Sequence, residues 1–488
     1  MKNTAKNNIK NTVKNTVKST PKNYRKVTEN PCSMCMPMGG ILPFKGIAGA
    51  MVLLHGSQGC ATYMRRHMAE HFNEPVDVAS SSLNEKGTVY GGENNLKLGL
   101  DNLIKLYNPG LIGLLTTCLA ETIGEDTGRV ALEYLAERRI KGFPIISVPT
   151  PGYADTHSEG YWAAAKAIIA KLARKTDEHS GINIIVPHIS PADIREIKRI
   201  LQLMAIEFTL FPDFSDTLDR PYSNTYKKIP DGGTKPADIG AMPGARATVQ
   251  MGITVNDSVS PGKYLEDEFG IPLYNIPIPM GLENTDTFVQ TLKEITGKKT
   301  PESLYFERGR LLDCMIDSHK YNFQGRSAVF GEPELVYAMA RTCAENGVFP
   351  VVAATGSRNS GMVTLLRTEA AGWQAEIKRP GKAAGTIEPR IFSGADFIQI
   401  REACRETNVN IAIGSSDGRY LTEKEGIPLV RMGFPIHDRV GGQRLLSVGY
   451  VGTAMFLDRV TNTLLENKYR NYRSDMYTRF YNRPLTRR

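Results

Sequence analysis

The chain has 488 residues, of which 41% are hydrophobic and 23% charged, and its formal net charge is +9. The length suggests two to four domains at roughly 100–200 residues each, and the composition is ordinary for a globular protein. No apolar run approaches the ~20 residues that a membrane helix needs, and the N-terminus lacks the apolar core of a signal peptide. We therefore expect a soluble, cytoplasmic protein with no membrane association.

The positive charge is concentrated at the two ends of the chain. Residues 1–30 carry +7 and residues 467–488 carry +6, which leaves −4 for residues 31–466. The first segment repeats Lys every fourth residue among Asn and Thr, as low-complexity arms do. We interpret both ends as solvated or partner-contacting extensions. Because no recognition motif accompanies the charge, we expect no nucleic-acid binding.

From residue 31 onward, apolar runs of strand length alternate with amphipathic stretches of helix length. This alternation predicts an α/β fold with parallel sheets flanked by helices. Three Rossmann-like domains are predicted at about 31–178, 179–324 and 325–466, between a basic arm (1–30) and a basic tail (467–488). Strands are predicted at 50–54, 111–115, 144–148, 182–186, 327–330, 349–353 and 411–413, and helices at 128–139, 161–173, 191–204 and 333–345.

Seven cysteines in a long chain without a secretory signal argue against a disulfide framework. Cys60 follows a buried strand through a glycine-containing loop, and Cys118 ends a second buried strand. Ligands collect beyond the carboxyl ends of strands in open parallel sheets, so both thiols should face one crevice. Cys35 lies in a predicted loop before the first strand and could close over it. The remaining cysteines, apart from Cys32, fall in helical patterns as small apolar residues: Cys314, Cys343 and Cys404.

Three interpretations of the early cysteines are open on spacing alone. Converging thiolates can hold one face of an iron–sulfur cluster, with a partner supplying further ligands. A structural zinc site would need two close pairs, and Cys32/Cys35 is the only one. The cysteines could also be buried and inert. The glycines after His55 match neither a Walker loop nor G-x-G-x-x-G, so a nucleotide-binding enzyme is the weakest alternative, and we expect His55 to shape the loop by bonding its backbone.

Several motifs in fixed order resemble those of a known family. Residues 54–60, Leu-His-Gly-Ser-Gln-Gly-Cys, are similar to the cluster-ligating loop of nitrogenase component 1 beta subunits. The resemblance extends from Pro31 to about Glu466. Its other carriers are Arg66–Gly92 (with His71-Phe-Asn-Glu-Pro75 and Val89-Tyr-Gly-Gly92), Thr116–Gly124, Arg308–Asp313, Asp317–His319, Gly331–Pro333, Val430–Pro435 and Asp438-Arg439.

The resemblance implies much that spacing does not show. It implies an α₂β₂ assembly in which an eight-iron cluster lies at each alpha–beta interface, with three cysteines from each side. The matching positions here are Cys35, Cys60 and Cys118, which could alternatively hold a smaller [4Fe–4S] cluster. An ATP-hydrolysing iron protein would dock near Tyr90. Electrons would pass through the cluster to a metal cofactor in the alpha subunit, so this oxidoreductase chain would contain no catalytic residue of its own.

The sequence departs from the family pattern at a few positions. Gly152 stands where the molybdenum-type beta subunit has a Ser that can ligate the oxidised cluster, and Cys32 is additional to the usual set. The stretch from His437 to Arg444 is also similar to the scaffold subunit on which the iron–molybdenum cofactor is built. A biosynthetic scaffold subunit is therefore the alternative to an electron-relaying subunit, and nitrogenase-like reductases of other substrates are a further one.

Overall fold

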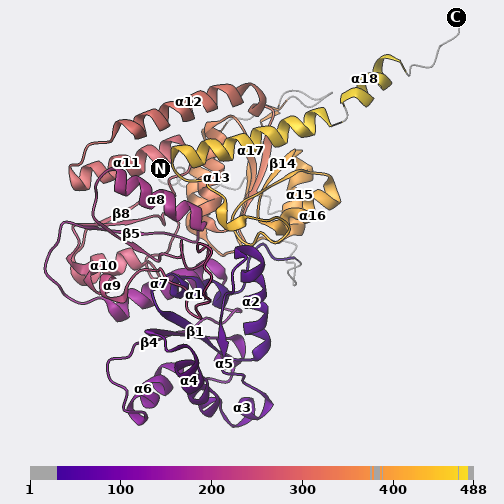
Figure 1. The fold of residues 1–488 in the computed structure, drawn as a ribbon. Coiled ribbons are helices and arrows are strands. Elements are labelled where there is room, and N and C mark those ends of the chain that lie inside the picture. Colours follow the sequence, from indigo (N-terminus) through magenta and orange to yellow (C-terminus); the bar gives the residue numbers. More distant parts are fainter. Residues whose placement is uncertain (1–29, 374–375, 378–384, 387, 471, 482–488) are drawn as a thin grey trace, which may run out of the picture.

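The structure is a computed structural model that describes residues 30–373, 376–377, 385–386, 388–470 and 472–481. The predicted arm, apart from Asn30, and residues 482–488 of the predicted tail lie outside the described residues. The chain traces three successive α/β segments, which Figure 1 colours from indigo through magenta to orange.

Each segment builds one parallel sheet, which confirms the predicted α/β class. The first has the order β2-β1-β3-β4, the second β6-β5-β7-β8 and the third β13-β10-β9-β14-β15. β11 and β12 form a separate antiparallel pair. The predicted domain boundaries between the sheets stay predictions. The strands are β1 (Ala50–His55), β2 (Ala79–Ser80), β3 (Leu111–Thr116), β4 (Ile145–Val148), β5 (Ile182–Ile185), β6 (Phe208–Phe211), β7 (Thr248–Gln250), β8 (Leu273–Asn275), β9 (Arg326–Phe330), β10 (Phe349–Ala354), β11 (Glu376–Ile377), β12 (Gly385–Thr386), β13 (Arg390–Phe392), β14 (Ile411–Gly414) and β15 (Leu429–Arg431).

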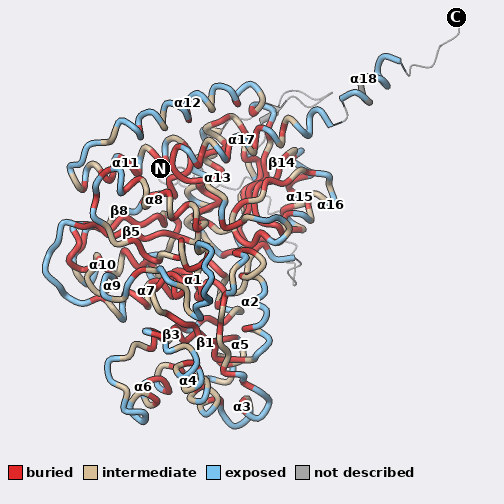
Figure 2. The backbone as a smooth tube through the Cα atoms, viewed as in Figure 1, coloured by how far each residue is buried: buried red, intermediate tan, exposed pale blue. Residues whose placement is uncertain are grey.

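Helices cover these sheets, so β1, β3, β5 and β14 are buried along their whole length (Figure 2). A strand covered on both faces reads as a continuous apolar run, which is the signal the sequence carries. The helices are α1 (Met36–Lys45), α2 (Gln58–Phe72), α3 (Glu85–Tyr90), α4 (Glu93–Tyr107), α5 (Cys118–Thr122), α6 (Thr127–Glu137), α7 (His157–Leu172), α8 (Pro191–Leu203), α9 (Pro236–Ala241), α10 (Pro261–Phe269), α11 (Leu282–Thr296), α12 (Glu302–Asn322), α13 (Pro333–Glu345), α14 (Ser360–Ala370), α15 (Phe397–Thr407), α16 (Arg419–Glu425), α17 (Gly449–Tyr469) and α18 (Tyr472–Phe480).

Helix α1 corrects the prediction that Cys35 lies in a loop. Cys35 is the N-cap of α1. The prolines and glycines of this helix are residues typical of loops, which is why the sequence predicts a loop here. Pro37 occupies the first turn, where its missing N–H costs nothing. The glycines allow close packing, because a Cβ on Gly39 would lie 1.8 Å from the carbonyl oxygen of His157 in α7. Tertiary packing thus outweighs the poor intrinsic helix propensity of this segment.

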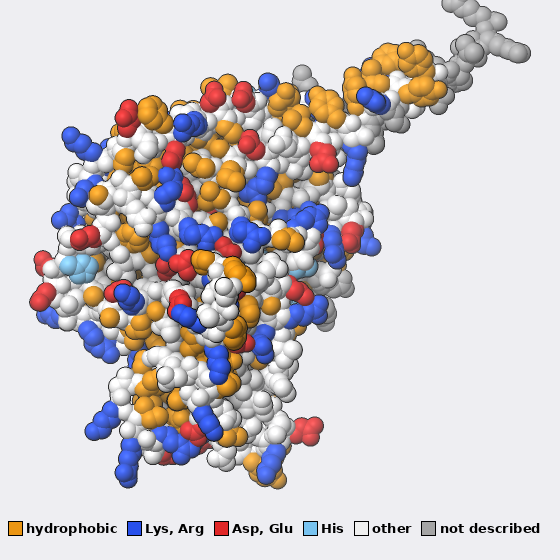
Figure 3. Space-filling model, in the orientation of Figure 1, with side chains coloured by type: hydrophobic (Ala, Val, Ile, Leu, Met, Phe, Trp, Pro, Cys, Tyr) orange, Lys and Arg blue, Asp and Glu red, His pale blue; other side chains and the backbone are white. Residues whose placement is uncertain are grey.

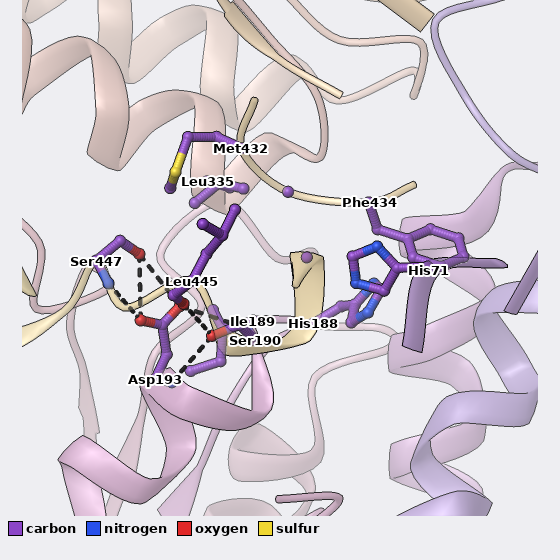
Figure 4. Close-up of a pocket in the computed structure, with 12 residues that line it drawn as sticks. His71, His188, Ile189, Ser190, Asp193, Leu335, Met432, Phe434, Leu445 and Ser447 are labelled. Atoms are coloured by element: carbon purple, nitrogen blue, oxygen red, sulfur yellow. Dashed lines mark hydrogen bonds between the residues drawn. The ribbon is translucent and has the colours of Figure 1, made fainter. Parts of the chain in front are cut away.

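The three segments meet at a buried group of imidazole and phenyl rings (Figure 4). His71 comes from α2, His157 from α7, and His188 from the loop after β5. Nε2 of His157 lies 2.9 Å from Nδ1 of His188, and Nδ1 of His71 accepts the backbone N–H of Ile436 at 2.9 Å. Phe434 stacks on His157 with ring centroids 5.4 Å apart. These contacts join all three segments.

We expect this junction to weaken the protein in mild acid. Burial lowers the pKa of His71 and of His157 to about 3. Both are neutral in the folded chain but take up protons on unfolding below pH ~6.5, so stability is lost as the pH falls from there toward 3. Each contributes about 1.4 kcal/mol per pH unit in that window. Urea unfolding between pH 7.5 and 5.5 measures the slope, which His71→Asn, an acceptor that does not titrate, should reduce. An equal slope in that variant would contradict the assignment.

The surface carries mixed charge. In Figure 3, basic and acidic side chains are interspersed over the visible face, while apolar side chains cover the projecting α18. In the part of the chain that the structure describes, no helix combines the length and apolarity that crossing a membrane requires.

Candidate metal centre

Two of the predicted ligands follow neighbouring strands of the first sheet. β1 and β3 pair in parallel, and His55 at the end of β1 lies opposite Thr116 at the end of β3. Cys60 and Cys118 therefore lie past the same edge of the sheet, as predicted. Their local structure differs from the prediction, because Cys60 lies in the first turn of α2 and Cys118 is the first residue of α5.

Gly152, in the turn after β4, lies close to two of the thiols. A Cβ at this position would be 2.5 Å from Sγ of Cys35 and 3.4 Å from Sγ of Cys118. The backbone N–H of Gly152 also donates to Sγ of Cys118 at 3.2 Å. Glycine here thus leaves room for both sulfur atoms, a role that sequence reasoning missed because it considered only the lost side-chain ligand. A glycine after a strand end is too common a signal to reveal this contact.

The third thiol, that of Cys60, belongs to the same group, because its charge acts on Cys35. Burial raises the pKa of Cys35 to about 11, and negative charge on Cys118 and then on Cys60 adds to that rise. Ser57 donates from Oγ to Sγ of Cys60 at 3.5 Å. The arrangement brings Cys35, Cys60 and Cys118 together at one rim.

Each of the three cysteines stands at the N-terminus of a helix. Cys35 caps α1, Cys60 is in the first turn of α2, and Cys118 opens α5. Helix N-termini favour negative charge, so these positions suit thiolate ligands. Cys118 is exposed, whereas the other two are half-buried. Among the described residues no three His, Cys, Asp or Glu side chains are arranged to hold a single metal ion.

The other cysteines lie elsewhere. Cys32 is only three residues from Cys35, yet it is buried in the core of the third sheet with Phe330 and Val351, so it is not a fourth member of the group. Burial raises the pKa of its thiol, as do the charges of Asp417 and Glu332. Three remain in the helices of the later segments: Cys314 is half-buried, and Cys343 and Cys404 are buried.

His55 and Glu125 connect this rim to an exposed turn. Nδ1 of His55 is 2.9 Å from Oγ of Ser81, which in turn accepts the N–H of Gly56 at 3.1 Å, so His55 supports the loop through Ser81 and not by bonding its backbone directly. Oε2 of Glu125, just after α5, is 3.8 Å from Nε2 of His55, and Oε1 accepts the N–H of Gly92 at 2.5 Å. Beside Gly92, at the end of α3, Tyr90 is 82% exposed.

Comparison with known proteins gives the family. Residues 35–465 match the family described as nitrogenase component 1 type oxidoreductase. The chain belongs to this family. The match begins at Cys35 itself and runs through all three sheets, which confirms the resemblance drawn from the motifs.

Several relatives are similar over nearly their whole length. The nitrogenase molybdenum-iron protein beta chain of Methanococcus maripaludis is 36% identical, with 91% of this chain and 96% of that protein covered. The nitrogenase molybdenum-iron protein beta chain of Clostridium pasteurianum is 34% identical, with 90% of this chain and 93% of that protein covered. A solved structure titled "Nitrogenase Cp1 at pH 6.5" superposes with a TM-score of 0.84 at 32% identity, covering 91% of this chain and 94% of that one. The chain is thus a nitrogenase component 1 oxidoreductase subunit of the beta-chain-like type.

Proposed function

We propose that this chain relays electrons through an iron–sulfur cluster held by Cys35, Cys60 and Cys118 at the interface with an alpha-type subunit. The observation that supports this most is that the sulfur atoms of Cys35 and Cys118 both lie against the position that a Cβ on Gly152 would take, with Cys60 close enough for its charge to act on Cys35. Soft thiolate ligands of this number suit one face of a cluster.

The residues present fit the group. Three thiols at helix N-termini would supply negative ligands where the backbone stabilises them, and Gly152 leaves the space beside Cys35 and Cys118 free of a side chain. Cys118 is exposed, so a cluster held by these thiols would be accessible to a partner at this residue. We infer that an alpha-type subunit closes this side and adds its own ligands, which gives the eight-iron form in an α₂β₂ assembly. A [4Fe–4S] cluster is the smaller form that the same thiols could hold.

The electron path begins, in this proposal, at the exposed turn containing Tyr90. An ATP-hydrolysing iron protein would dock there, in the cytoplasm, and electrons delivered to the site of Cys35, Cys60 and Cys118 would continue to a metal cofactor in the alpha subunit. The cluster supplies the redox chemistry. This chain positions the thiols, donates the Gly152 N–H to the sulfur of Cys118, and contributes no acid or base. Hydrogen bonds to ligating sulfur atoms are one of the ways a protein tunes a cluster's potential.

The complex purified without oxygen tests the proposal directly. We expect a brown protein that contains iron and acid-labile sulfide and whose cluster is reduced by the iron protein only with ATP. A folded, colourless complex free of iron, with its alpha partner present, would contradict the cluster. Iron without ATP-dependent reduction would favour the scaffold subunit, the alternative that the loop after His437 leaves open.

A further inference from the structure

A second, separate feature of the third segment is an open cavity of about 410 Å³ between β15, the loop that follows Phe434, and α17. Three arginines line it against a single carboxylate, Glu466. The cavity is remote in sequence from the three cysteines and shares no lining residue with their rim. The lining arginines are Arg431, Arg439 and Arg459.

Only one of these arginines has a full internal partner. Arg431 pairs with Asp438 at 2.6 Å, and Oδ1 of that carboxylate also accepts Oγ of Ser416 at 2.5 Å. Arg439 reaches the same Asp438 only at 3.7 Å and is exposed. Arg439 also donates to the backbone carbonyl of Asp438 at 2.6 Å, a neutral acceptor, so among the described residues its only carboxylate contact is the long one to Asp438, which Arg431 already engages.

Arg459 is the arginine of this cavity best placed to bind an anion, because its hydrogen-bond partners are neutral. Its guanidinium is half-buried on α17 and donates to the carbonyl of Met455 at 3.3 Å and to the sulfur of Met432 at 3.4 Å, which are neutral acceptors. Within the described part of the chain, no carboxylate lies within ion-pair distance of it. Asp193 acts on it electrostatically, but Ser447 and Val448 already donate to that carboxylate.

A half-buried guanidinium without a counter-ion is costly unless an anion reaches it. We propose that this cavity binds a small oxyanion, a phosphate or a carboxylate, on Arg459 and Arg439. The planar donor fork of arginine matches two oxygens of either group. The volume admits a small molecule with some of its water, and the open mouth gives access from solution. The site is independent of the cluster.

Binding is measured by calorimetric titration of inorganic phosphate, and separately of succinate, into the purified full chain with the partner subunits that accompany it. We expect saturable binding of at least one probe, and the stronger probe identifies the class of oxyanion. Arg459→Gln should weaken it about tenfold or more, as loss of a charge-assisted fork does. Arg401→Gln is the matched control, since Arg401 already pairs with Glu425 outside the cavity.

A second variant keeps the test valid if Arg459→Gln does not fold. Arg439→Gln changes an exposed side chain and should weaken the same binding while the far-ultraviolet circular dichroism stays unchanged. The proposal is overturned if neither probe binds saturably, or if binding is as tight in both variants as in the control. A carboxylate of the alpha subunit seated on Arg459 in a structure of the complex would overturn it as well.

Discussion

Cys118→Ala and Cys60→Ala should each remove most of the cluster iron, and electron delivery to the alpha subunit should be lost with it. The Cys118 sulfur lies 3.4 Å from where a Cβ on Gly152 would stand and accepts the N–H of Gly152 at 3.2 Å, and Cys60 lies in the first turn of α2, past the same edge of the sheet. No other described cysteine is placed to substitute. Iron and sulfide analysis, with electron paramagnetic resonance of the reduced complex, measures the loss. Cys35→Ala should behave in the same way.

The matched controls are cysteines outside the group. Cys32→Ala changes a thiol that is close in sequence but buried in the core of the third sheet, and Cys314→Ala changes a half-buried thiol on α12. Both should keep the full iron content. Retention of the cluster in both Cys60→Ala and Cys118→Ala, or its loss in Cys314→Ala, would show that the ligands have been assigned wrongly.

Gly160→Ala should destabilise the protein and also disturb the cluster. A Cβ on Gly160 of α7 would lie 2.0 Å from the carbonyl oxygen of Met36 in α1, a backbone atom that cannot rotate away. Separating the two helices should cost roughly 1–3 kcal/mol, the usual cost of overpacking, despite the better helix propensity of Ala. Cys35 precedes Met36, so its thiol moves with α1. Chemical denaturation and iron content measure the two effects.

Gly309→Ala is the control for this substitution. Gly309 is also inside a helix, α12, but a Cβ there would meet nothing within 4 Å. This variant should be more stable by about 0.5–1 kcal/mol, because Gly is a poor helix former, and it should retain its iron. Equal stability changes in the two variants would contradict the close contact of α1 with α7.

The sequence predicts the strands well where they are buried on both faces. β1, β3 and β5 lie within a residue or so of the predicted runs, because a covered parallel strand must be continuously apolar. Short strands such as β7 and β8 are not predicted from the sequence, since three residues are too few to show a hydrophobic period. The predicted helix from Gly128 to Arg139 is α6, and a left-handed Gly124 separates it from α5.

The candidate site was predictable in part. Strand ends give the placement of Cys60 and Cys118, because neighbouring parallel strands end at one edge. Cys35 needed the family resemblance, since nothing local shows that a segment rich in Pro and Gly forms a helix. The space kept by Gly152 is a contact between residues more than thirty positions apart, which only the folded chain displays. Iron and sulfide analysis of the cysteine variants tests whether the three thiols bind the cluster.

The interlocked α1 and α7 have a consequence for assembly. The backbone of α1 packs directly against that of α7 through Gly39 and Gly160, so contacts within the polypeptide position the thiol of Cys35. Small zinc modules work the other way, because there the ion itself drives the polypeptide to fold. For the proposed cluster this contact predicts that α1 and α7 keep their packing without iron, so that the cluster would be inserted into an already folded subunit.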